Sequence, residues 1–143
     1  MAIPELSTSL RSTISALHKG LRKQVNSINS YSMTELETIG HLFRQPSLLP
    51  TELASLTRVT TQTMSQILKK MEEQSVIKRT PSKEDKRKVY ISLTNSGKKM
   101  VEEAKYEKDE WLKVAIEKAL TDKEKELLLK AIPVLNKIME VKY

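Results

Sequence analysis

The chain has 143 residues, a length typical of one domain, and a formal net charge of +7. It contains no cysteine, which excludes disulfides, thiolate catalysis and zinc–thiolate sites. The N-terminal residues lack the pattern of a signal peptide, and no apolar run reaches the ~20 residues of a membrane-spanning helix. We therefore expect a cytoplasmic protein with no membrane partner.

The positive charge is concentrated in the middle third of the chain. Residues 58–100 hold eleven lysines and arginines against four acids, a net charge of +7. Residues 1–57 have five basic and four acidic side chains (+1), and residues 101–143 have nine and ten (−1). Positive charge gathered on one small unit is typical of a protein that binds nucleic acid.

The N-terminal part of the chain predicts two helices. Apolar residues at spacings of three and four, from Leu6 to Ile28, predict a helix over 5–28. A polar break over 26–32 precedes a second helix, Met33 to Arg44, for which Ser32 is the expected N-cap and Glu35 completes a capping box. Tyr31, beside the break, is a candidate for lining a ligand cleft.

Two further helices follow at the spacing of a helix-turn-helix. Pro50 suits the first turn of a short helix that ends near Leu56, and Thr60 is a good N-cap for a helix from Thr61 to Gln74. The side chains expected to face inward are Leu53, Ala54 and Leu56 from the first helix and Met64, Ile67, Leu68 and Met71 from the second. Met33 is also expected in the core.

The pattern then changes to alternation with a period of two. Val76 to Arg79 and residues 89–93 predict two strands, joined by the polar and mostly basic loop 80–88. Two strands with a charged tip form a β-hairpin, which in this position is the wing of a winged helix-turn-helix.

Two helices are expected to complete the chain. Thr94 can cap a helix that ends near Ala119, and Thr121 with Glu124 forms a capping box for the last one, where Pro133 predicts a kink or a local break. The last helix is apolar on more than one face, so we expect it to be buried with the first helix in a homodimer interface of about 2,000 Å² or more. The competing interpretation is a large core within one monomer.

The helix-turn-helix and the wing supply the candidate DNA contacts. Polar side chains near the start of the second helix can read base edges in the major groove, and cations at its edges can bind phosphates. Arg87 is the candidate for the minor groove, whose negative potential favours an arginine, and Asp85 is expected to hold that or another nearby guanidinium. The full set of candidate DNA contacts is Arg58, Thr61, Gln62, Thr63, Ser65, Gln66, Lys69, Lys70, Lys83, Asp85, Lys86, Arg87 and Lys88.

Residues 49–97 resemble the MarR family of bacterial transcriptional regulators. The resemblance includes Thr51-Glu52-Leu53-Ala54, the run from Thr63 to Glu72 and Val76-Ile77-Lys78-Arg79, and its most specific part is Asp85-Lys86-Arg87 followed by Leu93-Thr94-Asn95-Ser96-Gly97. The resemblance implies a homodimer on a pseudopalindromic operator, usually a repressor released by a small ligand. It also implies that Arg87 enters the minor groove and that residues 61–69 face the major groove.

One departure from the family pattern follows the second helix. Family members often have glycine there, where a left-handed C-cap is useful, whereas this chain has Gln74-Ser75. Either the serine adopts the left-handed conformation at some cost, or the helix ends differently.

The expected protein is mainly α: a single MarR-like domain over 1–143, with a winged helix-turn-helix lobe over 33–97 and dimerisation helices in 1–32 and 98–143. No nucleophile, acid–base pair or glycine-rich phosphate loop indicates an enzyme or a cofactor. His18 and His41 without cysteine partners do not indicate a metal site, and Trp111 is expected to be a packing residue. The alternative function is a winged-helix module that docks on an acidic protein.

Overall fold

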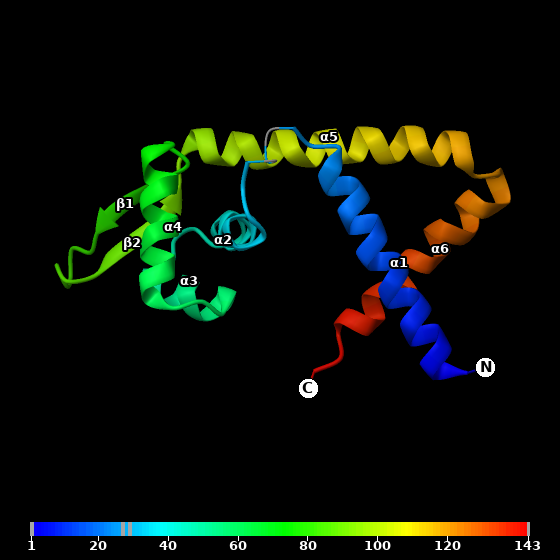
Figure 1. Ribbon diagram of the computed structural model, residues 1–143, viewed down its shortest axis with the longest axis horizontal. Coiled ribbons are helices and arrows are strands. Elements are labelled where there is room, and N and C mark those ends of the chain that lie inside the picture. The colour runs from blue at the N-terminus through cyan, green and yellow to red at the C-terminus, as the bar shows by residue number, and fades with distance from the viewer. Residues whose placement is uncertain (1, 27, 29, 143) are drawn as a thin grey trace.

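The computed structural model describes residues 2–26, 28 and 30–142 and is mainly helical (Figure 1). In chain order its elements are α1 (Ile3–Lys23), α2 (Met33–Arg44), α3 (Pro50–Thr57), α4 (Thr61–Glu73), β1 (Ile77–Pro81), β2 (Val89–Leu93), α5 (Asn95–Ala119) and α6 (Asp122–Met139).

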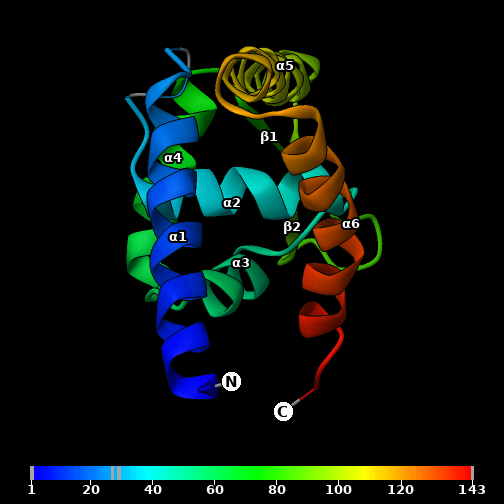
Figure 2. The same ribbon diagram turned by 90° about the vertical axis from the view of Figure 1, so that its right-hand side faces the viewer.

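The long helix α5 connects two different ends of the molecule. Helices α2, α3 and α4 and the β1–β2 hairpin pack together at one end, whereas α1 and α6 extend at the other (Figure 1). In Figure 1 α1 and α6 cross, but the view turned by 90° shows that they lie apart (Figure 2). The fold class predicted from the sequence, mainly α with a two-stranded wing, is confirmed.

The hydrophobic core lies in the winged lobe and at its junction with α5. Buried apolar side chains from α2, α3, α4 and β2 form much of it: Leu42, Leu53, Met64, Leu68, Met71 and Ile91. By contrast, the described residues of α1 and α6 include no buried side chain. Leu6, Ile14 and Leu17 on α1 and Leu128 and Ile132 on α6 are exposed. The apolar terminal helices are therefore not part of a large monomer core.

Helix α1 ends five residues earlier than the sequence predicts. The chain turns after Lys23, where the Val25 amide donates to the Arg22 carbonyl oxygen, and both Val25 and Ile28 are buried outside the helix. The apolar spacing continues past the end of the helix because the lobe's core, not a helical face, receives these two side chains. Ser27 and Asn29, in the predicted polar break, lie outside the described residues.

Helix α2 begins where the sequence predicts, but its capping box is incomplete. The Ser32 hydroxyl accepts a hydrogen bond from the Glu35 amide at 3.1 Å, as expected of an N-cap. The Glu35 carboxylate binds Lys70 on α4 instead of returning to Ser32. Met33 is also exposed, not in the core, because it lies on the side of α2 that borders a cavity.

The turn between α3 and α4 depends on one left-handed residue. Arg58 ends α3 with φ 57°, and the Val59 amide then donates to the Ala54 carbonyl oxygen at 3.0 Å. Leu53 and Ala54 are buried as predicted, but Leu56 is 51% exposed. A second left-handed residue, Ser75 with φ 61°, follows α4 and leads the chain into the hairpin. The serine thus adopts the conformation that glycine would adopt without strain.

The wing is an antiparallel hairpin in which Ile77 pairs with Leu93 and Pro81 with Val89. Strand β1 begins one residue later and ends two residues later than predicted, and β2 has the predicted bounds. Leu48, between α2 and α3, exchanges two backbone hydrogen bonds of 2.8 and 2.9 Å with Ile91. This bridge attaches the base of the wing to the helix-turn-helix.

The two C-terminal helices begin at the predicted caps. Thr94 accepts from the Gly97 amide at 2.9 Å, and Thr121 with Glu124 forms the predicted capping box. Gly97 also lies so close to the Val76 carbonyl that a Cβ there would collide with it. Helix α6 continues through Pro133 without the local break that was one expectation. None of the helices in the described part of the chain is long and apolar enough to cross a membrane.

Candidate nucleic-acid interface

The polar residues at the start of α4 form an exposed face. Successive turns of α4 bury Met64, Leu68 and Met71 against the core, and the opposite face of the helix is exposed. All five predicted base-reading side chains are exposed: Thr61, Gln62, Thr63, Ser65 and Gln66. An exposed polar helix of this length fits the width of the DNA major groove.

The N-terminus of α4 is ordered by Thr60. Its hydroxyl accepts from the Thr63 amide at 3.1 Å and donates to the Thr63 hydroxyl oxygen at 2.9 Å. The Thr63 hydroxyl accepts this hydrogen bond and can still donate its own hydrogen to another acceptor. The exposed face therefore begins with an oriented hydroxyl donor beside helix amides that favour a phosphate.

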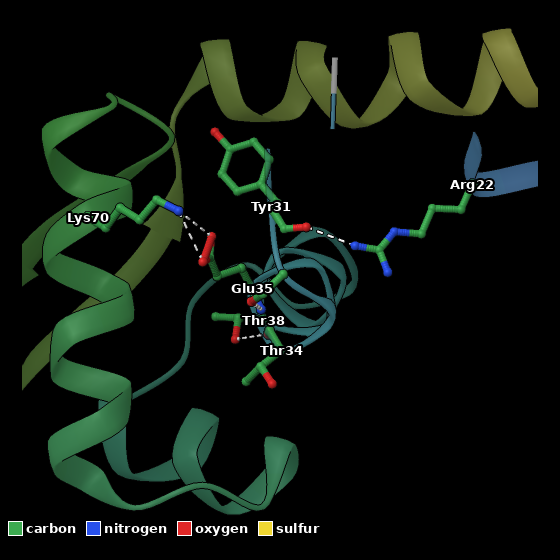
Figure 3. A network of polar contacts seen from close by, with 7 residues as sticks. Arg22, Tyr31, Thr34, Glu35, Thr38 and Lys70 are labelled. Atoms are coloured by element: carbon green, nitrogen blue, oxygen red, sulfur yellow. Dashed lines mark hydrogen bonds and ion pairs between the residues drawn. The ribbon is translucent and has the colours of Figure 1, made fainter. Parts of the chain in front are cut away.

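The cations around α4 have two different environments. Arg58 and Lys69 are exposed, as expected of side chains that contact phosphates. Lys70 instead points toward the start of α2, where its Nζ lies 3.0 Å from the Glu35 carboxylate (Figure 3). The Glu35 carboxylate already neutralises the Lys70 ammonium, so the attraction between Lys70 and a DNA phosphate is weaker. Lys70 is therefore a weaker candidate contact than the sequence indicates.

The tip of the wing carries an arginine whose side chain is hydrogen-bonded to a neighbouring carboxylate. Arg87 donates from its amide and its Nε to Asp85 Oδ1 at 3.1 and 3.2 Å. These bonds, the side-chain bond first, lower the pKa of the Asp85 carboxyl. The amides of Glu84 and Asp85 donate to the Ser82 hydroxyl, and the Lys88 amide donates to the Asp85 carbonyl. Lys83, Lys86 and Lys88 are exposed around this turn.

Two basic residues of β1 are also exposed and were not among the candidates from the sequence. Lys78 is exposed, and the Arg79 Nε donates to the Glu72 carboxylate of α4 at 3.2 Å. The ion pair joins the wing to the end of α4. Their adjacent positions in a predicted strand could have indicated an exposed cation. Neighbouring strand residues point to opposite faces, so at least one of the two had to be solvated.

A cavity of about 360 Å³ separates the winged lobe from α1. Its apolar wall comes from α2 and α5, and its polar rim carries Arg22, Arg44, Lys105 and Lys108 against one carboxylate, Glu37. His18 also lines it, but Tyr31, the candidate from the sequence, does not. Tyr31 is buried, and burial raises the pKa of its hydroxyl. Within the described residues, no group of histidine and acidic side chains could hold a metal ion.

A family model matches the central part of the chain. Residues 31–89, from the end of the α1–α2 connection to the second strand, match the model of the MarR family. Over this region the chain is similar to the MarR family. The resemblance seen in the sequence is thus confirmed, including its winged helix-turn-helix fold.

The curated relatives are named as HTH-type transcriptional regulators, not as enzymes. The chain is 28% identical over 98 residues to the HTH-type transcriptional regulator YwaE of Bacillus subtilis, which is 68% of this chain and 57% of that relative. The chain thus spans less than two thirds of YwaE. It is 26% identical over 107 residues to the HTH-type transcriptional regulator MT0903.1 of Mycobacterium tuberculosis, 75% of this chain and 74% of the relative.

Solved structures share the whole fold. The transcriptional regulator Tm0710 from Thermotoga maritima aligns with a TM-score of 0.81 at 18% identity, over 96% of this chain and 95% of that one. A variant of S. aureus MepR, solved bound to an oligodeoxyribonucleotide, gives 0.71 at 22% identity over 94% and 98%. NadR, in complex with 4-hydroxyphenylacetate, gives 0.61 at 26% identity over 96% and 94%.

Proposed function

We propose that this protein is a MarR-family regulator and that it controls transcription by binding double-stranded DNA at a specific sequence. The observation that carries the proposal is the placement of the polar start of α4 beside the cationic wing, at the end of the molecule farthest from α1 and α6 (Figure 1). One helix and one hairpin of this kind can occupy neighbouring major and minor grooves. The MepR variant of the same fold, solved bound to an oligodeoxyribonucleotide, supports the proposal.

Each exposed side chain of this surface then has a role. Thr61, Gln62, Thr63, Ser65 and Gln66 read base edges, and Arg87, held by Asp85, enters the minor groove. The remaining cations bind phosphates and make the affinity fall steeply with salt, because each releases counterions: Arg58, Lys69, Lys83, Lys86 and Lys88, with a smaller contribution from Lys70.

The protein acts as a homodimer in this proposal. Residues 33–97 form the reading lobe, while 1–32 and 98–143 form the dimerisation region. The support for a homodimer comes from α1 and α6. Both helices expose apolar side chains, and neither contains a buried residue within one chain. A face of this kind is expected to be covered by a partner. Two lobes related by a two-fold axis would read a pseudopalindromic operator with half-sites ~10 bp apart.

A small organic anion is the proposed effector, and repression is the proposed mode of regulation, in the cytoplasm where the DNA lies. The cavity beside α1 combines an apolar wall with four permanent cations and one carboxylate, which suits a carboxylate on an apolar body. The complex of NadR with 4-hydroxyphenylacetate is consistent with such a ligand in this fold.

Selection from a random pool of duplexes tests the function. The full-length protein should retain duplexes that share one symmetric sequence, and sedimentation at micromolar concentration should give the mass of two chains. Retention of no duplex at low salt, together with binding to an acidic protein, would instead support the interaction-module alternative. The sedimentation coefficient of a single chain would contradict the dimer. The duplex selection would still test DNA binding in that case.

A further inference from the structure

The end of α4, the base of the wing and the start of α5 meet at one place in the fold (Figure 1). Thr94 lies at this junction. Its hydroxyl donates to the Ser75 carbonyl oxygen at 2.6 Å, with the Val76 carbonyl oxygen at 3.2 Å, and accepts a hydrogen bond from the Gly97 amide at 2.9 Å. The Thr94 amide also donates to the Val76 carbonyl oxygen at 3.0 Å. One residue therefore bonds the turn between α4 and β1 to the first turn of α5.

The turn that accepts the Thr94 hydrogen bond is strained. Ser75 has φ 61°, its amide donates to the Glu72 carbonyl oxygen at 3.0 Å, and the Val76 amide donates to the Met71 carbonyl oxygen at 2.9 Å. Glycine usually holds the left-handed position of such a helix end without strain. Another residue persists there only where the surrounding structure holds it. The Thr94 hydroxyl supplies such a contact from 19 positions along the chain.

The junction explains two residues of the motif Leu93 to Gly97, which none of the proposed DNA contacts uses. A helix cap alone requires a threonine but no glycine three residues later. Gly97 is needed because a Cβ at this position would collide with the Val76 carbonyl oxygen. The first turn of α5 thus packs directly on the turn after α4, and the Thr94 hydroxyl bonds the two together.

We propose that Thr94 is a positioning residue for DNA recognition, because its hydroxyl fixes the direction in which the wing leaves α4. The proposal rests on the proposed function. Strand β1 alone carries the chain about 13 Å away from the Ser75 turn, so a rotation of about ten degrees at the turn moves the far end of the strand by roughly 2 Å. A hydrogen bond does not tolerate a displacement of this size. The distance between the major-groove and minor-groove contacts of one half-site therefore depends on Thr94.

Thr121 offers a matched control, since it caps α6 as Thr94 caps α5. Its hydroxyl accepts from the Glu124 amide at 3.2 Å, and α6 lies at the other end of the molecule from the wing (Figure 1). Aspartate is as good a helix cap as threonine, but an ionised carboxylate cannot donate a hydrogen bond. Thr94→Asp and Thr121→Asp therefore both keep their caps, and of the two only Thr94→Asp removes the donor to Ser75. Thr94→Ser keeps both the cap and the donor.

Amide hydrogen exchange of the full-length protein tests the junction without DNA. Thr94→Asp should raise the exchange rates of residues 75–80 several-fold relative to those of α2, whose amides report unfolding of the whole lobe. Thr94→Val, which removes the donor without adding a charge, should do the same. Thr121→Asp and Thr94→Ser should leave residues 75–80 at the rates of the unmodified protein. Unchanged rates for these residues in Thr94→Asp and Thr94→Val would overturn the proposal.

Operator spacing tests the consequence for recognition. One base pair is inserted in each half-site of the selected operator, between the bases that α4 reads and those that the wing reads, which moves the wing contact by about 3.4 Å. The unmodified protein, Thr94→Ser and Thr121→Asp should bind this operator at least about ten-fold more weakly than the parent operator. For Thr94→Asp the two affinities should differ by less than about three-fold, because its wing can rotate.

Undiminished discrimination between the two operators by Thr94→Asp would overturn the positioning role. Absence of duplex binding by the unmodified protein would contradict the proposed function itself. The exchange rates of residues 75–80 would still decide, in that case, whether Thr94 holds the turn.

Discussion

The Asp85 carboxylate holds the Arg87 guanidinium at 3.2 Å even though the Arg87 side chain is 91% exposed. An ion pair this open adds little to the stability of the fold. Its effect is to orient a flexible side chain before DNA arrives, which lowers the entropy that binding must remove. The finding agrees with the sequence-based expectation that Asp85 holds a nearby guanidinium.

Arg87→Ala should weaken operator binding at least ten-fold, a loss of about 1.5–3 kcal/mol for a hydrogen-bonded charge. The protein should stay folded, because Arg87 lies outside the core. Fluorescence anisotropy with a labelled operator at fixed salt measures the effect. Lys123→Ala removes the same charge from the exposed start of α6 and should change the affinity little. Equal affinities of Arg87→Ala and the unmodified protein would refute the assignment.

Asp85→Asn should weaken binding as well, although it removes a negative charge from a DNA-binding surface. Long-range electrostatics alone predicts tighter binding. Loss of orientation of one side chain predicts a cost of about 0.5–1.5 kcal/mol. The same anisotropy titration decides between tighter and weaker binding. Tighter binding by Asp85→Asn would show that the Asp85–Arg87 pair has no positioning role.

The Asp85–Arg87 contact has a defined pH range. Hydrogen bonds from Arg87 lower the pKa of Asp85 below its ordinary value, so the charged contact is fully present above that ordinary value, about 3.9, and is lost as the pH falls through the lowered value. The Arg87 Nε resonance should therefore stay constant from pH 8 to pH 5 and shift only in more acidic solution. A shift near neutral pH would identify a different titrating group.

Gln66→Ala should alter base preference, whereas Lys69→Ala should lower all affinities alike. Both side chains are exposed on α4, but an amide can bond adenine in two places and an ammonium contacts phosphate. We expect Gln66→Ala to lose about 1–3 kcal/mol at one operator position. Affinities over a panel of single-base operator variants measure both. Unchanged relative affinities in Gln66→Ala would exclude base reading by that side chain.

Ile14→Asp should convert the dimer to monomers without unfolding the winged lobe. Ile14 is exposed at the centre of the apolar face of α1, so burying an unpaired carboxylate there on dimerisation would cost several kcal/mol. Ser12→Asp, two residues away and thus on the opposite side of the helix, is the control. Sedimentation velocity distinguishes the two states, and an intact dimer in Ile14→Asp would place the interface elsewhere.

Ser75→Gly should raise the free energy of unfolding by up to about 1 kcal/mol. Ser75 has φ 61°, a conformation that costs an L residue roughly 1–2 kcal/mol. Glycine avoids this cost, but its greater conformational freedom in the unfolded chain offsets part of the gain. Ser75→Ala keeps the Cβ and should give no gain. Urea denaturation of the three proteins measures the difference, and equal stability of all three would show that the turn is unstrained.

The caps explain how much of the fold was predictable. Ser32, Thr60, Thr94 and Thr121 each accept a bond from an amide three residues later, a local interaction that is visible in the sequence. The end of α1 was not predictable, because Val25 keeps helical spacing while packing into a core that forms only in three dimensions.

The candidate site was predictable only where its signals are local. The exposed face of α4 and the Asp85–Arg87 pair follow from periodicity and from two positions two residues apart. The Glu35–Lys70 contact joins residues 35 positions apart, and a capping role for Glu35 was the simpler local interpretation. Arg22 carries no motif either, since its hydrogen bond to the Tyr31 carbonyl depends on where α1 ends relative to α2.

Helix α5 is long enough for a small tilt to displace its far end appreciably. Its 25 residues make it about 37 Å long, and it joins the helical end of the molecule directly to the wing. Tilting a rod of this length by five degrees displaces its far tip by roughly 3 Å, close to the 3.4 Å rise between stacked base pairs. If the proposed dimer binds DNA, a small change in the tilt of α5 would therefore move the wing by about one base-pair step along the duplex.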